Sequence, residues 1–516
     1  MASRLLWIDD EIDMLKPHVL FLEKKGYDVA TCNNGSDALR RCASEPFDLI
    51  LLDENMPGLS GLETLQGIKE MQPDVPVVMV TKNEEEDLMD QAIGAQIADY
   101  LIKPVNPNQI LLTLKKNIHQ RAIVSEATQS AYSRAFSELQ MQISENSGFE
   151  QWKELYRSLV RWELQIEEAA VPMAEMLAMQ KVEANAHFFR FVKRHYEDWV
   201  NNPDERPLMS PDVMKRTVFP LLREGRRVFL LVLDNFRYDQ WRALAPELSD
   251  AFDIDEDLYL GILPTATGYA RNAIFAGMMP ADIKRMYPHL WVDDTQEEGK
   301  NQHEEELLRL QLERFRRKEK FSYNKLNDSQ AAERLLGQLK GLANVPLNVL
   351  VVNFIDILSH ARTDSRMVRE LMGDEAAYRS ITLSWFRHTA VKELFAALAE
   401  QDADIVITTD HGSIYVDNPV RVQGDREVNT NLRYKLGRNL SYPAREVFEM
   451  KQPARFGLPA PNLSTVYIYA AGRSFFAYPN NYNHYVQYYR GTFQHGGISM
   501  EEMLIPLVRL RPKSSR

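Results

Sequence analysis

Acidic and histidine side chains recur through the C-terminal half of the chain, and their types suit a metal centre. They occur in the fragments Leu233-Asp234-Asn235, Asp356-Ile357-Leu358-Ser359-His360, Asp410-His411-Gly412 and His495-Gly496-Gly497. Carboxylate and imidazole ligands without a thiolate suit catalytic Zn²⁺, with Mn²⁺ a weaker choice. Two such ions a few ångströms apart are a common arrangement for phosphoryl transfer. The fragments therefore make the chain an enzyme candidate.

The residues before three of these fragments indicate how they could meet. Short apolar runs rich in β-branched residues end just before the acids, at Val228–Leu233, Asn348–Phe354 and Ile405–Thr409. Runs of this kind predict buried parallel strands, and open α/β sheets build their sites at the carboxyl ends of such strands. Asp356 and His360 are four residues apart, so one helical turn would point both the same way. We therefore expect the acids and histidines to converge at one edge of a sheet.

Pro264-Thr265-Ala266-Thr267 supplies a hydroxyl for the same site. Thr267 precedes a helical pattern, Ala270–Phe275, and the N-terminus of a helix favours phosphate. A metal would lower the pKa of the hydroxyl, which makes Thr267 the predicted catalytic nucleophile. Arg271, one turn on, is the second predicted catalytic residue, holding phosphate oxygens bidentately. Taken singly, Thr267 is typical of a helix N-cap and Arg271 of a surface residue.

A second set of polar residues follows the strands predicted for the N-terminal 120 residues. The expected strands are Arg4–Ile8, Asp28–Thr31, Leu49–Leu52, Pro76–Val80 and Ala98–Ile102. Asp9 and Asp10 follow the first, Asp53 the third, Thr81 the fourth and Lys103 the fifth. Clustered carboxylates repel one another unless a cation lies among them, and an oxygen-lined site suits Mg²⁺. A carboxylate between Mg²⁺ and a lysine can attack a phosphoryl donor to give an aspartyl phosphate.

This N-terminal set resembles the receiver domain of two-component response regulators over about residues 3–120. The resemblance implies that Asp53 is the phosphorylation site and that Thr81, Tyr100 and Lys103 form the receiver switch. In the family, Lys103 would contact the phosphate and precede a cis bond to Pro104. The implied magnesium ligands are Asp9, Asp10, Asp53 and the backbone carbonyl of Asn55.

The C-terminal fragments resemble the alkaline phosphatase superfamily over about residues 215–512. Asp234 to Gln240, His495 to Ser499 and Glu501 to Pro506 look like its PglZ branch. The resemblance implies two zinc ions. One would be held by Asp356, His360 and His495, and the other by Asp234, Thr267, Asp410 and His411.

Composition and pattern divide the chain into three expected domains. They are a response-regulator receiver domain over 1–122, a helical bundle linker over 123–212 and a PglZ or alkaline-phosphatase-superfamily domain over 213–516. The expected fold class is α/β: a doubly wound (βα)5 receiver, a central α-helical bundle and a C-terminal α/β alkaline-phosphatase-like domain. Helically spaced Trp152, Leu155 and Leu159 support the bundle, and we expect its His187 and His195 to serve in packing or at the surface.

The whole-chain composition excludes several classes of protein. A length of 516 residues predicts several domains, and 45% hydrophobic with 26% charged residues is typical of soluble globular proteins. The net charge of −12 argues against a protein that coats nucleic acid. With Cys32 and Cys42 alone, neither a disulfide framework nor a thiolate zinc site is available. No apolar run reaches the roughly 20 residues of a membrane span, so we expect a cytoplasmic protein.

A basic stretch follows the Asp-His pair, and the sequence supports two interpretations of it. Its members, all within 421–438, are Arg421, Arg426, Arg433, Lys435 and Arg438. The simpler interpretation is a solvated loop, and the alternative is a substrate gate that holds a nucleotide backbone. Aromatic residues are few there, so this stretch does not indicate base stacking.

A receiver and a PglZ-like region in one chain resemble the PorX-like response regulators, which are tied to type IX secretion. That resemblance implies a sensor histidine kinase as partner, together with type IX secretion components or a sigma factor. We expect a zinc-dependent phosphodiesterase rather than a monoesterase, acting on a nucleotide or oligonucleotide, although these motifs leave the substrate open. Phosphorylation would favour a homodimer. The alternative is a non-catalytic regulator whose PglZ domain binds partner proteins, while the acidic charge disfavours a DNA-binding transcription factor.

Overall fold

A computed structural model describes residues 3–73, 75–82, 97–169, 172–294, 299, 301–327, 329–342, 344–424, 429, 431–479 and 481–513 of the chain. The chain forms two compact units. One comprises Met1–Tyr132 with Ala169–Val171, and the other comprises Ser133–Glu168 with Pro172–Arg516.

The first unit contains a five-stranded parallel sheet with the strand order β2-β1-β3-β4-β5. Its strands are β1 (Arg4–Ile8), β2 (Asp28–Cys32), β3 (Leu49–Asp53), β4 (Val77–Thr81) and β5 (Asp99–Ile102). Its helices include α1 (Lys16–Lys24), α2 (Gly35–Cys42), α3 (Gly61–Met71) and α5 (Pro107–Leu114). Alternate residues of the strands pack against α2 and α3 in one core and against α1 and α5 in the other. Because both faces are covered, the prediction of a doubly wound sheet is confirmed.

Three long helices occupy the middle of the sequence, as predicted. They are α6 (Gln120–Glu145), α7 (Phe149–Glu168) and α8 (Ala174–Asn201), and α7 packs against α8. The predicted stripe of Trp152, Leu155 and Leu159 is buried. The expectation that His195 serves in packing is confirmed, because its ring stacks on Trp199 of the same helix.

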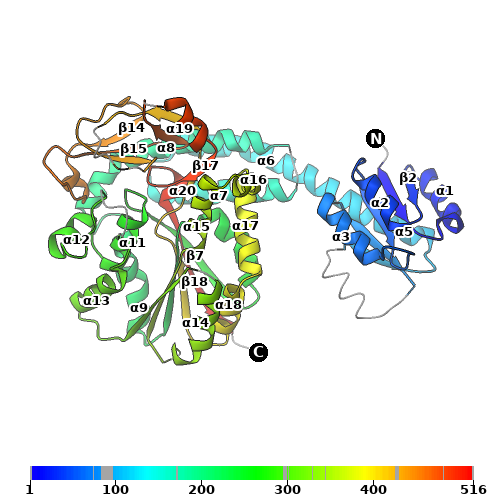
Figure 1. The fold of residues 1–516 in the computed structure, drawn as a ribbon, viewed down its shortest axis with the longest axis horizontal. Helices are drawn as coiled ribbons and strands as arrows, with labels where there is room; N and C mark the ends of the chain where they lie inside the picture. The colour runs from blue at the N-terminus through cyan, green and yellow to red at the C-terminus, as the bar shows by residue number, and fades with distance from the viewer. Residues whose placement is uncertain are drawn as a thin grey trace. The chain divides into compact units, whose positions relative to one another are not determined.

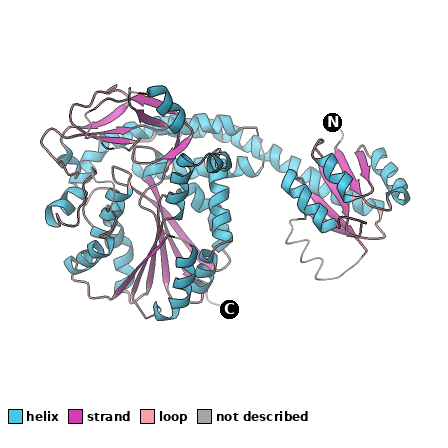
Figure 2. Cartoon of the chain, in the orientation of Figure 1, coloured by secondary structure: helices cyan, strands magenta, loops and turns pink. Residues whose placement is uncertain are grey.

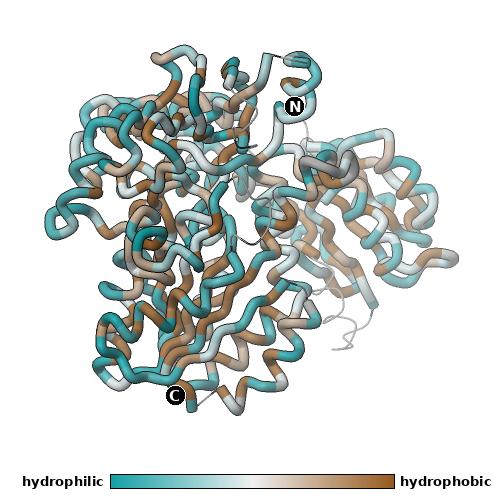
Figure 3. Tube along the Cα trace, turned by 60° about the vertical axis from the view of Figure 1, so that its left-hand side comes forward, coloured by the Kyte–Doolittle hydropathy of each residue, from teal (hydrophilic) through white to brown (hydrophobic). Residues whose placement is uncertain are grey.

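The second unit is built on a six-stranded mixed sheet with the order β7-β18-β10-β6-β9-β8. Its strands are β6 (Val228–Leu233), β7 (Phe252–Leu260), β8 (Phe321–Leu326), β9 (Leu347–Val352), β10 (Asp404–Thr408) and β18 (Leu504–Pro512). Every residue of β6, β9 and β10 is buried, as continuous apolar runs predict for central parallel strands. Figure 3 shows these strands as mainly brown, hydrophobic tubes through the middle of the unit.

Helices flank this sheet, and smaller sheets lie beyond one of its ends (Figures 1 and 2). The helices are α9 (Phe219–Arg223), α10 (Tyr238–Leu244), α11 (Thr267–Ala276), α12 (Pro280–Met286), α13 (Glu304–Arg314), α14 (Ser329–Leu342), α15 (Phe354–Asp364), α16 (Arg366–Leu371), α17 (Glu375–Arg387), α18 (Ala390–Ala399), α19 (Tyr482–Tyr489) and α20 (Met500–Met503). The small sheets pair β11 (Ile414–Val416) with β17 (Thr492–Gln494), β12 (Asn418–Arg421) with β16 (Ser474–Ala477), and β15 (Val466–Ala470) with both β13 (Tyr434–Gly437) and β14 (Val447–Met450). None of the helices in the described part of the chain combines the length and hydropathy needed to span a bilayer.

Candidate metal centres

The ends of β6, β9 and β10 bring the predicted C-terminal ligands together. These three strands are neighbours and run parallel, with Leu233 opposite Val352 and Thr408 opposite Val232. Asp234 and Asp410 therefore leave the sheet side by side, and α15 begins just beyond β9 to carry Asp356. The register of parallel strands, rather than proximity in sequence, creates the site.

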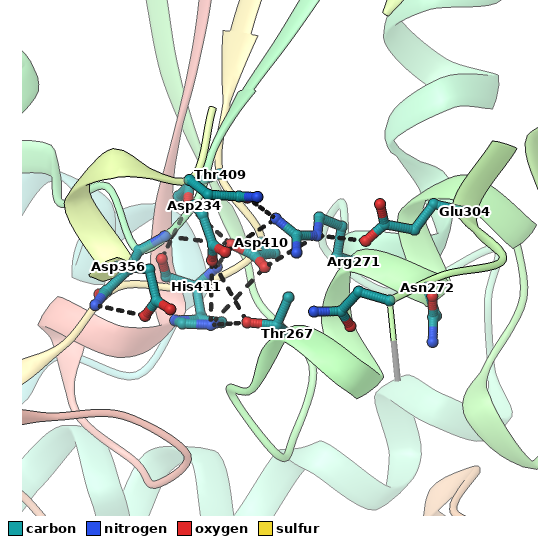
Figure 4. Close-up of polar contacts among 12 residues, drawn as sticks. Asp234, Thr267, Arg271, Asn272, Glu304, Asp356, Thr409, Asp410 and His411 are labelled. Atoms are coloured by element: carbon teal, nitrogen blue, oxygen red, sulfur yellow. Dashed lines mark hydrogen bonds and ion pairs between the residues drawn. The ribbon is translucent and has the colours of Figure 1, made fainter. Parts of the chain in front are cut away.

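Asp234, Asp410 and His411 form the first group, in which one ligand atom from each residue lies within 4.8 Å of the others. His411 Nε2 is 3.8 Å from Asp234 Oδ1 and 3.8 Å from Asp410 Oδ2. Thr267 Oγ1 is 3.0 Å from the same Nε2 and 3.4 Å from Asp234 Oδ1. All four residues predicted for one zinc thus meet at one point (Figure 4).

Asp356, His360 and His495 form the second group, with ligand atoms again within 4.8 Å of one another. Asp356 Oδ2 is 3.4 Å from His360 Nε2, one helical turn away on α15, and Asp356 Oδ1 is 4.0 Å from His495 Nε2. The rings of His411 and His495 stack with centroids 4.1 Å apart, so the two groups adjoin. The His360 side chain is 66% exposed, which leaves this group open to solvent on one side.

The donor sets fit zinc. Two ligands of one tetrahedral zinc lie roughly 3.4 Å apart, given bonds of about 2.0–2.1 Å, so the separations within each group need only small adjustments. The His495 Nδ1 faces the Thr265 carbonyl at 3.1 Å, and the His411 Nδ1 faces the Gly412 carbonyl at 3.2 Å. Each carbonyl favours the tautomer that leaves Nε2 free for a metal. Asp410 Oδ2 is buried and accepts no hydrogen bond from the described residues, so its lone pairs are also free.

Burial gives these groups unusual acidities. It raises the pKa of the Asp234 carboxyl well above its ordinary value, although Arg271 opposes the shift. Burial would also raise the pKa of Asp410, but the charges of His411 and Arg271 hold it below the ordinary value. The pKa of His495 falls well below its ordinary value because the ring is buried beside His411 and His360. His495 is therefore neutral near pH 7, the form in which histidine binds metal.

Thr267 is the first residue of α11, as predicted, and follows the extended backbone of Ala266. Arg271 lies one turn on, but it is buried rather than at the surface. Its Nη1 is 3.0 Å from Asp234 Oδ2 and 3.1 Å from Asn353 Oδ1, and its Nε is 2.7 Å from Glu304 Oε1 (Figure 4). The bidentate hold of Arg271 on phosphate stays a prediction, and the contacts give it a second role in positioning Asp234.

Several residues that build the site were not singled out from the sequence. Glu304 lies in a charged run that is typical of an exposed helix, yet it is 1% exposed and contacts Arg271. Asn235, at φ 62°, donates from its Nδ2 to Asp356 Oδ1 at 3.3 Å and to Ser359 Oγ at 3.0 Å. Thr409 Oγ1 accepts from the Phe236 backbone N–H at 3.1 Å. Asn235 and Ser359 lie inside the sequence fragments that contain the ligands. That position was the one sequence feature that could have indicated their role.

The basic stretch after the Asp-His pair is not a single solvated loop. Arg433 and Lys435 are buried, so the solvated interpretation is wrong for them. Arg433 forms a two-point contact with Glu502, and Lys435 Nζ donates to the Asn429 carbonyl at 2.7 Å. Burial lowers the pKa of Lys435 to about 7. Arg421 and Arg438 are exposed, and Arg426 lies outside the described residues.

The predicted residues of the receiver switch also meet at the strand ends of the first unit. Asp9, Asp10 and Asp53 offer ligand atoms within 4.8 Å of one another. Lys103 Nζ is 2.8 Å from Asp9 Oδ2 and 3.0 Å from Asp53 Oδ1. Burial raises the pKa of Asp53, an effect that Lys103 opposes. An all-oxygen donor set of this kind fits Mg²⁺.

The remaining switch residues lie on β4 and β5. Thr81 ends β4 opposite Ile102, and its carbonyl accepts from the Lys103 N–H at 2.7 Å. Tyr100 lies on β5, and its side chain is 37% exposed. Asn55 follows β3 in the loop after Asp53. The predicted cis bond between Lys103 and Pro104 is confirmed.

Comparison with protein families assigns both ends of the chain. Residues 213–510, more than half of the 516, match the alkaline phosphatase-like domain PglZ of the BREX system. The chain belongs to the PglZ alkaline phosphatase-like family. Residues 5–115 match the response regulator receiver domain, and residues 122–200 match the linker domain of the PorX response regulator. Together the three matches give a PorX-like architecture.

Relatives and solved structures share the receiver portion. The CpxR homolog of Haemophilus influenzae is 37% identical over 122 residues, or 23% of this chain and 52% of that protein. ResD of Bacillus subtilis is 32% identical over 133 residues, or 26% of this chain and 52% of that protein. The chain thus spans about half the length of these two curated relatives. A CheY-like receiver from Methanospirillum hungatei is 28% identical, with a TM-score of 0.23, and covers 23% of this chain and 96% of its own.

The chain therefore joins a receiver domain of the response-regulator type to a domain of the alkaline phosphatase superfamily. The PglZ match covers both C-terminal ligand groups and Thr267, and the receiver match covers Asp9, Asp10, Asp53, Thr81 and Lys103.

Proposed function

We propose that phosphorylation of Asp53 controls a zinc-dependent phosphodiesterase in the PglZ domain. The observation that carries the proposal is the position of Thr267. Its hydroxyl touches Asp234 and His411, at the N-terminus of α11 and beside a second ligand group. A hydroxyl in contact with two metal ligands can be activated as a nucleophile by the metal. A threonine that only caps a helix would not require contacts to metal ligands.

Two zinc ions would be held as the superfamily implies. Asp356, His360 and His495 would bind one. The other would be bound by Asp234, Thr267, Asp410 and His411. When bound, the ions would lower the pKa of the Thr267 hydroxyl and stabilise charge on the phosphate oxygens.

The protein's own residues account for the rest of the reaction. Thr267 Oγ1 would form a bond to phosphorus while the bond from phosphorus to the leaving oxygen breaks, and water would then release the phosphoryl group from Thr267. Backbone N–H groups in the first turn of α11 would hold phosphate oxygens. Arg271 orients Asp234 and opposes the rise in the pKa of its carboxyl, and it would balance added negative charge.

At the receiver, Asp53 would accept the phosphoryl group from a sensor histidine kinase. Asp9, Asp10, Asp53 and the Asn55 carbonyl would bind Mg²⁺, and Lys103 would contact the phosphate. Thr81 and Tyr100 would then change the face around β4 and β5 and favour a homodimer. The resemblance of the sequence to PorX-like response regulators motivates the further proposal of a setting in type IX secretion, with secretion components or a sigma factor as protein partners and an oligonucleotide as substrate.

The direct test is hydrolysis of bis(4-nitrophenyl) phosphate and of a short oligonucleotide by zinc-loaded full-length protein. We expect both to be cleaved, and Thr267→Ala to lower kcat by several orders of magnitude. The zinc content of the variant must be measured alongside, and Thr265→Ser serves as a control that keeps a hydroxyl at the neighbouring threonine. Equal rates for wild type and Thr267→Ala, with zinc retained, would refute the nucleophile. No turnover of either substrate would favour a non-catalytic docking regulator.

A further inference from the structure

Helix α19 presents a row of aromatic rings at the surface of the PglZ domain. In its sequence, Tyr-Asn-His-Tyr-Val-Gln-Tyr-Tyr, Val486 is buried in a core cluster, and Tyr482 and Tyr489 pack against the same cluster while partly buried. Tyr485 is 38% exposed and His484 is exposed beside it. Tyr485 stacks on Tyr489 at 6.3 Å with an interplanar angle of 6°, and His484 stacks on Tyr488 at 6.4 Å with 23°. The helix therefore offers the rings of His484 and Tyr485 to solvent, each backed by a half-buried tyrosine ring one turn on.

Arginines lie against the rings of this helix. The Arg421 guanidinium on β12 is 4.7 Å from the Tyr482 ring centre, and that of Arg369 on α16 is 5.6 Å from the Tyr488 ring centre. Arg421 is exposed and Arg490 is exposed at the end of the helix. A planar guanidinium on an aromatic face can still meet acceptors at its edge, and the exposed Arg421 presents that edge to solvent.

The segment that carries this surface is basic within an acidic chain. Residues 471–494 contain Arg473 and Arg490 but no aspartate or glutamate, whereas the whole chain carries a net charge of −12. Arg473 is paired with Asp417 at 2.7 Å, whereas Arg421 and Arg490 are exposed. Positive charge between aromatic rings is complementary to an anionic polymer that carries flat bases.

The same elements lead along the chain to two ligands of the second metal group. From α19 the chain enters β17, where Thr492 Oγ1 donates to the Tyr489 carbonyl at 2.6 Å, and β17 ends one residue before His495. On the other side, α15 carries His360 and runs on to α16, which carries Arg369. One segment runs from His495 back to α19, and the other runs from His360 on to α16. These two segments meet where the Arg369 guanidinium lies over the Tyr488 ring.

We propose that α19 and the flanking Arg421 bind a single-stranded oligonucleotide beside the metal centre. Bases would stack on Tyr485 and His484, and phosphates would pair with the exposed Arg421 and Arg490. This assignment rests on the proposed phosphodiesterase activity for its biological purpose, but the binding itself does not depend on turnover. The sequence pointed instead to the basic stretch after the Asp-His pair, which has few aromatic residues. The proposed base stacking is therefore assigned to α19.

Binding can be measured without hydrolysis in full-length Thr267→Ala protein. The probe is a fluorescein-labelled single-stranded octanucleotide followed by fluorescence anisotropy, and the matched probe has the same length and charge with abasic sites. We expect the abasic probe to bind about tenfold more weakly, and Tyr485→Ala to weaken binding of the normal probe by a similar factor. Tyr485→Phe keeps the ring and should bind as the parent does. Leu463→Ala, at a fully exposed position elsewhere, is the control for surface change.

The contribution of the arginines is tested separately, by the salt dependence of binding. Arg421→Gln should weaken both probes and reduce the salt dependence of binding, because one phosphate contact is lost. Equal affinity for both probes, or for the parent and Tyr485→Ala, would overturn the proposal. So would a fall in particle mass in Tyr485→Ala without a change in probe affinity, which would assign the surface to a second copy of the chain. Binding without hydrolysis by wild type would instead refute the proposed function and leave this inference standing.

Discussion

Replacing Arg433 with methionine tests whether the His495 turn is held by a buried ion pair. Arg433 and Glu502 are both 0% exposed at their side chains. Arg433 donates from Nε to Glu502 Oε1 at 3.1 Å and from Nη2 to Oε2 at 2.6 Å. Glu502 also accepts from the Gly497 N–H at 2.8 Å and from the Ser499 hydroxyl at 2.7 Å. The carboxylate therefore joins the arginine to the turn that follows His495.

Arg433→Met removes the positive charge and leaves Glu502 buried with two neutral donors. Breaking a fully buried pair costs about 3–5 kcal/mol, mainly because the remaining charge is left without its partner. Since about 1.4 kcal/mol corresponds to a factor of ten, the unfolded fraction of this domain should rise by roughly two to three orders of magnitude. Arg433→Met/Glu502→Gln removes both charges, so it should lose less stability than the sum of the two single variants.

Urea unfolding of full-length protein, followed by tryptophan fluorescence, gives the stability of the PglZ domain, which contains Trp241, Trp291 and Trp385. Arg438→Met is the matched control, since that arginine is exposed in the same stretch and should change stability by less than about 0.5 kcal/mol. A loss of under about 1 kcal/mol in Arg433→Met, or strict additivity in the double variant, would refute the reasoning. Either result would mean that the pair adds nothing beyond ordinary packing.

Three further predictions follow from the metal centres and the buried lysine. Protein kept free of chelator should hold close to two zinc equivalents by elemental analysis, and His360→Ala, at an exposed position, should lose about one while keeping its circular dichroism spectrum. A phosphoryl mimic with Mg²⁺ should raise the light-scattering mass of wild type but not of Asp53→Ala, and equal behaviour of the two would remove the receiver from control of assembly. Lys435 has its pKa lowered to about 7 by burial, so the unfolded state binds more protons between pH 7 and about 10. Stability of wild type relative to Lys435→Met should therefore rise with pH, by about 1 kcal/mol per unit from pH 7.5 to 9, and parallel stability curves would contradict this.

The C-terminal site could be predicted from the sequence because its ligands follow strands. A buried parallel strand has a strong apolar signature, and its carboxyl end fixes where the next side chain lies. The apolar runs alone therefore placed Asp234 and Asp410 at one edge of a sheet, and helical spacing joined Asp356 to His360. The metals themselves, and the roles of Thr267 and Arg271, stay predictions that the geometry supports.

The buried charged residues around the site could not be predicted from the sequence, because their burial depends on long-range contacts. Glu304 and Arg433 lie in runs of charge that normally face solvent. Their partners are far away in sequence, so composition and period carry no sign of the pairing. The helix α19 lacks a clear apolar stripe for a similar reason: Tyr482 and Tyr489 pack against the core beside Val486, whereas the ring of Tyr485 is exposed.

Burial of charge also shows how the helical middle is joined to the candidate site. Lys181 on α8 is buried, with Nζ 2.9 Å from Glu163, 2.8 Å from Glu375 and 3.6 Å from Glu501. Glu501 lies in the same short helix, α20, as Glu502, which holds the turn after His495. Moving α8 away would leave Glu163 paired with Arg379 and Glu375 paired with Arg237. Glu501 would lose Lys181 and also Asn185 of α8, whose Nδ2 donates to it at 3.0 Å, and leaving this buried carboxylate without them costs several kcal/mol. We therefore expect a displacement of α8 to carry Glu501 with it, so that the helix acts as part of the catalytic unit rather than as a passive spacer.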